Sequence, residues 1–123
     1  MALLLDTNIL IDHMRKVGPA IAFVQTLQGM PYASVVTITE LTAGARSAKE
    51  ETRIKHLTQW VRFLDVNHAI ADQAGRHMKH YRSSHDLDEI DALIAATAEH
   101  HGLEFATLNV RHFPMFRRLK PAY

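Results

Sequence analysis

Three acidic residues of this sequence each lie beside an apolar segment, where their charge has to be compensated. Asp6 comes directly after the apolar run 3–5. Glu40 and Asp91 lie at the starts of two later segments with apolar faces. An ionised carboxylate next to a protein core is unfavourable unless a cation, hydrogen-bond donors or water surround it. If the three carboxylates converge to about 5 Å, each pair repels by roughly 3 kcal/mol at an effective dielectric constant near 20. The pattern therefore predicts a bound cation or a raised pKa among these acids.

The residue types available near these acids indicate which cation and which chemistry they would serve. The three acids offer oxygen atoms as ligands, and the sequence contains no Cys. Such ligands suit Mg²⁺ or Mn²⁺ better than zinc. A hard cation that keeps open positions for water is suited to the hydrolysis of phosphoesters.

Each acid also has a purely structural interpretation. The stretch from Thr37 to Glu40 has the spacing of a capping box, which would place Glu40 at the N3 position of a helix. Asp91 stands at the same position behind Asp88, and Asp6 is a suitable N-cap. The helix dipole favours acids in a first turn without any metal. For Glu40 or Asp91 taken alone this interpretation is preferred, but it leaves unexplained why three acids adjoin apolar elements.

The elements that would position the acids alternate between strand and helix. Strands are expected at 2–5, 32–36, 63–66 and 104–108. Helices are expected at about 8–15, at 18–28, from 37 onward, at 49–60, at 69–82 and at 88–101, with a loop at 83–86 and a short final turn and strand within 111–121. This alternation predicts an α/β fold with a parallel sheet. The three acids would then lie at the carboxyl-end side of that sheet, where ligands bind in such folds.

Composition sets broad limits on the protein. The 123 residues suit one domain, residues 1–123, and the formal net charge of +1 does not by itself indicate nucleic-acid binding. We expect a soluble cytoplasmic protein, because the sequence shows neither a secretory signal nor an apolar run that could span a membrane. Among the nine histidines, His77 and His80 are one helical turn apart and His100 precedes His101. Positions on helix surfaces or helix ends are preferred over a zinc site for these residues, because no zinc motif is present.

Four blocks of the sequence, in this order, resemble the PIN-domain family. They are LLDTNILI at 4–11, TITEL at 37–41 followed by AG at 43–44, DALIAATA at 91–98, and TLNVRHF at 107–113. The length of the chain and the residues of these blocks are most similar to those of the VapC-type toxins of bacterial toxin–antitoxin pairs. The resemblance implies a three-layer PIN-like fold, in which helices flank a central parallel sheet of four to five strands. It also implies an Mg²⁺- or Mn²⁺-dependent endoribonuclease, a homodimer, and a small antitoxin that covers the site.

The resemblance assigns roles to individual residues. Asp6, Glu40 and Asp91 become the metal-binding acids, and Asn109 becomes a ligand through its carbonyl oxygen or through a bound water. Many family members have an acid three residues after this Asn, where this chain has His112. His112 could ligate a metal as neutral imidazole, contact a phosphate as imidazolium, or simply pack.

Two further residues lie near this set. Thr107 is a candidate hydrogen-bond donor behind the ligands, and Asp88 is first an N-cap and second a metal residue.

The expected reaction is the hydrolysis of an RNA phosphodiester by a metal-activated water. Asp6 and Asp91 would hold the principal metal, and Glu40 would complete its coordination or orient the nucleophile. Basic residues in two stretches are candidates for contacts to the RNA backbone, which give affinity without sequence specificity. They are Arg46, Lys49, Arg111, Arg117 and Arg118.

Two alternatives remain at this stage. One is a catalytically silent PIN module that binds RNA or a protein partner. The other is a phosphatase or phosphotransfer domain of similar topology. The latter is disfavoured for two reasons. Asn8 stands where a phosphatase of the haloacid dehalogenase type has its second Asp, and the paired acids that a receiver domain has at its first strand are absent from this sequence.

Overall fold

The core of the protein is a parallel sheet of four short strands. A computed structural model describes residues 2–123. The strands are β1 (Leu3–Leu5), β2 (Tyr32–Ser34), β3 (Arg62–Leu64) and β4 (Glu104–Ala106), and their order in the sheet is β3-β2-β1-β4. Every strand pair is parallel. The expected α/β fold with a parallel sheet is confirmed, and β1 lies at the centre, between β2 and β4.

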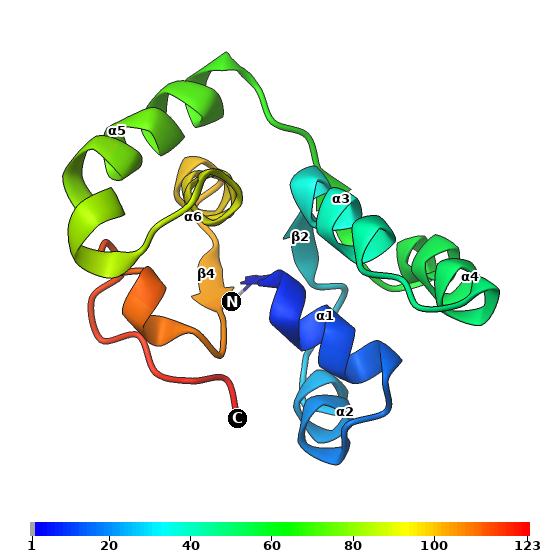
Figure 1. Cartoon of the computed structure of the whole chain (residues 1–123). Helices are drawn as coiled ribbons and strands as arrows, with labels where there is room; N and C mark the ends of the chain where they lie inside the picture. The colour runs from blue at the N-terminus through cyan, green and yellow to red at the C-terminus, as the bar shows by residue number, and fades with distance from the viewer. Residues whose placement is uncertain (1) are drawn as a thin grey trace.

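Helices connect the strands and cover both faces of the sheet (Figure 1). They are α1 (Thr7–Met14), α2 (Gly18–Gln25), α3 (Val35–Ala43), α4 (Ala48–His56), α5 (His68–His85) and α6 (Glu89–His100), with short 3₁₀ turns η1 (Leu57–Gln59) and η2 (Val110–His112). Within residues 2–123 no helix is both long enough and apolar enough to cross a membrane.

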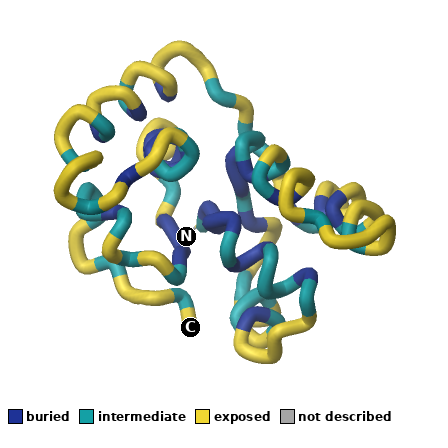
Figure 2. The backbone as a smooth tube through the Cα atoms, in the orientation of Figure 1, coloured by how far each residue is buried: buried dark blue, intermediate teal, exposed yellow. Residues whose placement is uncertain are grey.

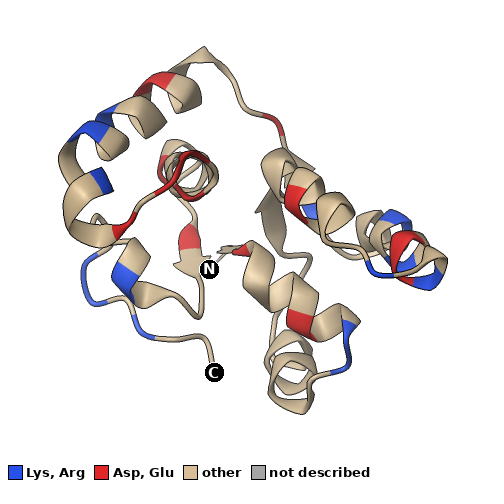
Figure 3. Cartoon of the chain, in the orientation of Figure 1, with Lys and Arg blue, Asp and Glu red and all other residues tan. Residues whose placement is uncertain are grey.

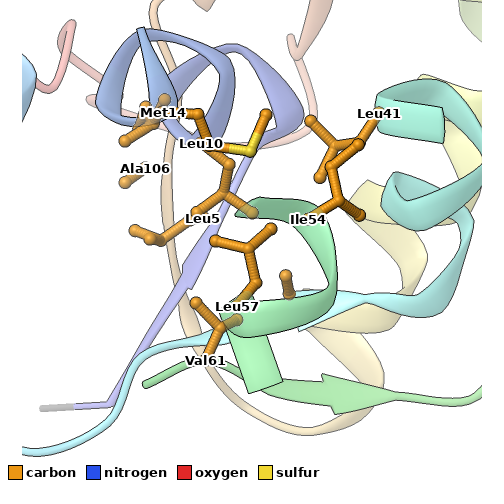
Figure 4. Packing of buried hydrophobic residues seen from close by; sticks show 10 residues of the cluster. Leu5, Leu10, Met14, Leu41, Ile54, Leu57, Val61 and Ala106 are labelled. Carbon is orange, nitrogen blue, oxygen red and sulfur yellow. The ribbon is translucent and has the colours of Figure 1, made fainter. Parts of the chain in front are cut away.

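Two neighbouring residues of β1 show how the layers form, because successive strand side chains point to opposite faces of a sheet. Leu5 packs in a cluster with residues of α1, α3 and α4, which Figure 4 shows from close by. Leu4 packs on the other face with α6 and with Phe113. Both leucines are fully buried. In Figure 2 the buried positions include parts of β1, β2 and β4 and part of α6.

The start of α3 differs from the expectation. The helix begins at Val35, and the hydroxyl of Ser34 caps it by accepting a hydrogen bond of 3.3 Å from the backbone N–H of Val36. The predicted strand 32–36 is therefore too long, because the β-branched pair Val35-Val36 favours a strand locally yet continues a helix here. The predicted capping box at Thr37 is wrong. Glu40 lies in the middle of α3, so the structural interpretation of this acid as a first-turn residue no longer applies.

Other boundaries also shifted. Helix α5 continues to His85 and ends at Asp86, whose φ of 52° is left-handed, so the loop predicted at 83–86 is mostly helix. Helix α2 ends at Gln25 rather than at 28, and the single helix expected at 49–60 consists of α4 and the turn η1. The third strand occupies Arg62–Leu64 rather than 63–66. Among the described residues no strand forms within 111–121, where the chain has the end of η2 and irregular structure.

Candidate active site at the carboxyl edge of the sheet

Asp6 is the most buried acid of the site. It follows β1 directly, and its side chain caps α1 through a hydrogen bond of 2.8 Å from the Thr7 backbone N–H to Oδ1. Its other oxygen, Oδ2, accepts a hydrogen bond of 2.6 Å from the Thr107 hydroxyl. The residue is only 4% exposed. Burial raises the pKa of Asp6 to about 6 and the charge of Glu40 adds to the rise, whereas the hydrogen bonds from Thr107 and Thr7 oppose it.

Glu40 is tied to the same region by a relay of hydroxyl groups. The Thr7 hydroxyl donates a hydrogen bond of 2.6 Å to Glu40 Oε1. It also lies 2.9 Å from the Thr37 hydroxyl. Since the Thr7 hydroxyl has one proton and gives it to Glu40, the Thr37 hydroxyl must be the donor in the second contact. Thr7 therefore links the start of α1 to the middle of α3, and it holds Glu40 beside the segment that carries Asp6.

Asp91 reaches the site from the first turn of α6. Its backbone N–H donates a hydrogen bond of 2.8 Å to Oδ1 of Asp88, which is the N-cap of this helix. The pKa of Asp91 is raised to about 6, chiefly by burial and also by the charges of Asp88 and Asp6, against the lowering effect of contact with His112. Asp91 and Asp6, which are 85 positions apart in the chain, are thus close enough for the charge of one to affect the pKa of the other.

His112 lies against Asp91 rather than in the core. Its Nδ1 is 3.3 Å from Asp91 Oδ2, and its side chain is 36% exposed. The charge of His112 lowers the pKa of both Asp6 and Asp91. The residue that stands in place of an acid therefore supplies compensating positive charge when it is protonated.

The segment after β4 closes the site from the remaining side. Thr107 is fully buried, and its hydroxyl accepts the backbone N–H of Asn109 at 3.0 Å while it donates to Asp6. The contact of Asn109 with this network is made by its backbone. The amide of Asn8, a residue the sequence did not single out as part of the site, donates to Asp6 Oδ2 at 3.3 Å.

Comparison with known proteins identifies the family behind this arrangement. A family model described as PIN domain matches residues 3–119. This chain belongs to the PIN domain family.

Named relatives of this PIN domain are curated as ribonucleases. The chain is 42% identical over 124 aligned residues to Ribonuclease VapC10 of Mycobacterium tuberculosis, with 98% of this chain and 92% of VapC10 covered. It is 39% identical to Ribonuclease VapC19 of the same organism, with 98% of each chain covered.

Among solved structures, the PIN domain resembles a chain of a toxin–antitoxin complex from Klebsiella pneumoniae. The TM-score is 0.80 at 28% sequence identity, and the match covers 100% of this chain and 98% of that chain. A second similar structure is DNA-bound VapBC from Salmonella typhimurium, with a TM-score of 0.81 at 22% identity over 100% of this chain and 99% of that chain. The expected PIN fold is confirmed.

The chemistry of the donor set decides whether a divalent cation fits this PIN domain. Among residues 2–123 no three His, Cys, Asp or Glu side chains are grouped closely enough to enclose a metal ion by themselves. Mg²⁺, however, usually keeps several waters and is held by one or two carboxylates. Asp6 and Asp91 match that requirement, because both are desolvated acids whose pKa is raised. The buried Oδ1 of Asn8, which has no hydrogen-bond partner within the described chain, also fits a hydrated ion.

The basic residues expected to contact RNA are exposed but do not form one patch. Figure 3 shows Lys and Arg along α4 and, on the other side of the molecule, along the C-terminal segment, with acidic positions at the starts of α1 and α6 between them. The exposed residues of the two groups are Arg46, Lys49, Arg111, Arg117 and Arg118.

The expectation that His77 lies on a helix surface is wrong. The residue is 7% exposed between α5 and α6, and its Nε2 contacts Oε1 of Glu99. Gln73 approaches the same nitrogen at 3.4 Å. A carboxylate from the neighbouring helix thus explains this buried histidine without a metal.

Proposed function

We propose that this PIN domain, residues 1–123, is an endoribonuclease that depends on Mg²⁺ or Mn²⁺ and acts as the toxin of a toxin–antitoxin pair. The observation that carries the proposal is the pair of desolvated carboxylates, Asp6 and Asp91, at the carboxyl edge of the sheet, each with a pKa raised to about 6. The names of its relatives, Ribonuclease VapC10 and Ribonuclease VapC19, support RNA as the substrate. The toxin–antitoxin complex with a similar fold supports the biological role.

Each side chain of the site would have its own role in the hydrolysis. Asp6 and Asp91 would hold the cation, which when bound supplies positive charge at the phosphate and water of lowered pKa. The hydrogen bonds from Thr107 and Thr7 fix the orientation of the Asp6 carboxylate. Glu40 uses Oε1 to accept the Thr7 hydroxyl, so Oε2 is the atom that would accept a proton from the attacking water.

His112 and the nearby bases would act on the substrate. The imidazole of His112 lies at the partly exposed rim beside Asp91, where a protonated ring would contact a phosphate oxygen. Arg111 precedes it in the same 3₁₀ turn and is exposed. Contacts of this kind give affinity that falls with salt and carry no base specificity.

The proposed antitoxin would dock on an apolar groove between α1, α2 and α4. The groove has a volume of about 420 Å³. Its apolar lining includes Met14, Ile21, Leu57 and Trp60, and its basic lining includes Lys16 and Arg53. An amphipathic segment with apolar and acidic side chains would complement such a surface. We further propose a homodimer, supported by the family resemblance, and a cytoplasmic location, where the RNA substrate would be found.

The deciding experiment is cleavage of total RNA by the purified chain with Mg²⁺, with Mn²⁺ and with EDTA, followed by sequencing of the cut ends. Discrete new ends that need a divalent ion and disappear in Asp6→Asn support the ribonuclease. Cleavage that persists in EDTA or in Asp6→Asn contradicts the proposed mechanism. If no RNA is cut with either metal, the silent module that binds RNA or a partner becomes the better interpretation.

A further inference from the structure

The side-chain amide of Asn8 makes hydrogen bonds in the site through its nitrogen but not through its oxygen. Its Nδ2 donates to Asp6 Oδ2 at 3.3 Å and lies 3.5 Å from the Thr107 hydroxyl. Its carbonyl oxygen, Oδ1, is buried and meets no hydrogen-bond donor within residues 2–123. Buried carbonyl oxygens are normally paired, so this atom requires an explanation.

The orientation of this amide is set by its neighbour. Reversing the amide would place Oδ1 against Oδ2 of Asp6, and with Asp6 ionised, the form that binds a cation, two acceptors would then face each other. The amide nitrogen must therefore face Asp6, and the carbonyl oxygen must face elsewhere.

The hydroxyl groups nearby cannot supply the missing donor. The Thr107 hydroxyl gives its single proton to Asp6 Oδ2 at 2.6 Å. The Thr7 hydroxyl gives its proton to Glu40 Oε1, also at 2.6 Å. With both protons committed, neither hydroxyl can donate to Oδ1 of Asn8, and no other donor within residues 2–123 reaches it.

We propose that Oδ1 of Asn8 accepts a hydrogen bond from a water in the hydration shell of the divalent ion held by Asp6. This inference rests on the metal dependence in the proposed function, and it makes Asn8 a positioning residue. One amide would then serve two purposes, because its nitrogen orients the ligand Asp6 while its oxygen orients a water. Partners of this kind around a metal typically change affinity by roughly 10–100-fold when they are removed.

The test is the binding of Mn²⁺ to the purified chain without RNA, measured by calorimetry and by the loss of the free-ion paramagnetic resonance signal. Asn8→Ala should raise the Mn²⁺ dissociation constant about tenfold. Asn8→Asp keeps an oxygen at the Oδ1 position and adds charge, so it should bind Mn²⁺ at least as tightly as the wild type. In EDTA, Asn8→Asp should have a lower Tm, because two carboxylates then face each other.

Two outcomes would overturn the inference. If Asn8→Ala binds Mn²⁺ like the wild type, the carbonyl has no role toward the ion. If both variants bind more weakly to the same extent, the amide acts only as a donor to Asp6.

Asn67→Asp is the matched control. Asn67 caps α5 by accepting the Ile70 backbone N–H at 2.9 Å, and Asp is an equally good cap, so its Mn²⁺ binding should be unchanged. A wild-type chain that binds no Mn²⁺ would overturn the inference together with the metal dependence. A chain that binds Mn²⁺ but cuts no RNA would contradict only the proposed ribonuclease.

Discussion

The Thr107 hydroxyl donates a hydrogen bond of 2.6 Å to Oδ2 of Asp6, and it joins the ends of two adjacent strands at the centre of the site. Thr107 follows β4 as Asp6 follows β1, and these strands pair in register, with Leu5 opposite Ala106. The same hydroxyl accepts the backbone N–H of Asn109 at 3.0 Å. A single buried hydroxyl therefore both orients the carboxylate and fixes the turn that leads toward His112.

Thr107→Val tests this relationship, because valine keeps the shape and removes the hydroxyl. The change leaves the Asn109 N–H without its acceptor and deprives Asp6 of its strongest donor. The free energy of unfolding should fall by about 1–3 kcal/mol, and RNA cleavage should fall about tenfold. Thr107→Ser keeps the hydroxyl and should retain most activity. Denaturant unfolding and initial cleavage rates measure the two effects, and equal activity of Thr107→Val and the wild type would contradict this role.

The raised pKa of Asp6 predicts how stability depends on pH when no divalent ion is present. The folded chain holds a proton on Asp6 up to about pH 6, whereas the unfolded chain loses it near the ordinary pKa of an aspartate, 3.8. Between these values the folded state binds more protons, so the contribution of Asp6 to stability falls as the pH rises. The loss is complete above about pH 6 and is at most about 3 kcal/mol. Divalent ions compete with these protons and should stabilise the chain more at pH 7.5 than at pH 5.

The comparison that isolates this effect is the wild type against Asp6→Asn, both in EDTA, with urea unfolding measured from pH 4 to pH 8. His13 contributes a slope of opposite sign, since burial lowers its pKa, but this contribution is common to both proteins. The wild type should lose stability relative to Asp6→Asn as the pH rises through 4 to 6. Parallel pH profiles of the two proteins would show that the pKa of Asp6 is not raised.

His112→Asp restores the acid that many family members have at this position. A third negative charge beside Asp91 and Asp6 should lower the Tm in EDTA, because it adds repulsion and removes the compensating imidazole. The same charge should increase the Tm gain on adding Mg²⁺. Thermal unfolding with EDTA and with MgCl₂ measures both effects. His80→Asp, on the exposed side of α5, is the control, and its Mg²⁺-dependent gain should equal that of the wild type.

The sequence predicted the parallel sheet, because strands alternate with helices along the chain. It also indicated one edge for the acids, because parallel strands bring their carboxyl ends to the same edge. Asp6 shows that its two interpretations were compatible, since it is both an N-cap and the most buried acid of the site. The start of α3 could not be predicted from local signals. Ser34 and Thr37 are both good caps, and Val35-Val36 fits a strand as readily as the first turn of a helix. Packing selected Ser34, which is fully buried at the end of β2.

The finer contacts of the site depend on side-chain geometry that spacing does not determine. Thr7 and Asn8 directly follow Asp6 in the first block of the family resemblance, which was the available signal for them. Nothing in the sequence shows that Thr7 reaches Glu40 across 33 positions. The strand expected after 111 is absent from the described chain for a similar reason. Just after that segment, the backbone N–H of Ala122 donates to the Thr107 carbonyl at 3.0 Å, but no strand pairing follows from it among the described residues.

The side chain of Tyr123 connects this last segment to α1, and removing its hydroxyl should lower the free energy of unfolding. Its hydroxyl donates a hydrogen bond of 2.7 Å to Oδ2 of Asp12, and its ring centroid lies 5.9 Å from that of Phe23. Tyr123→Phe keeps the ring and removes the donor. Because the contact is partly exposed, we expect a loss of about 1 kcal/mol, or a Tm decrease of about 3–5 °C.

The control for this change is Tyr32→Phe, which keeps its ring beneath the Arg62 guanidinium at 5.8 Å. Asp12→Asn should lose less than Tyr123→Phe, since an amide oxygen still accepts from the tyrosine hydroxyl. If Tyr123 serves only to fasten the segment, Mn²⁺ affinity should stay at the wild-type value in Tyr123→Phe while its Tm falls. A loss of Mn²⁺ affinity would instead show that loosening the C-terminal segment disturbs Asp6. The effect would pass through the hydrogen bonds that connect Ala122 to Thr107 and Thr107 to Asp6.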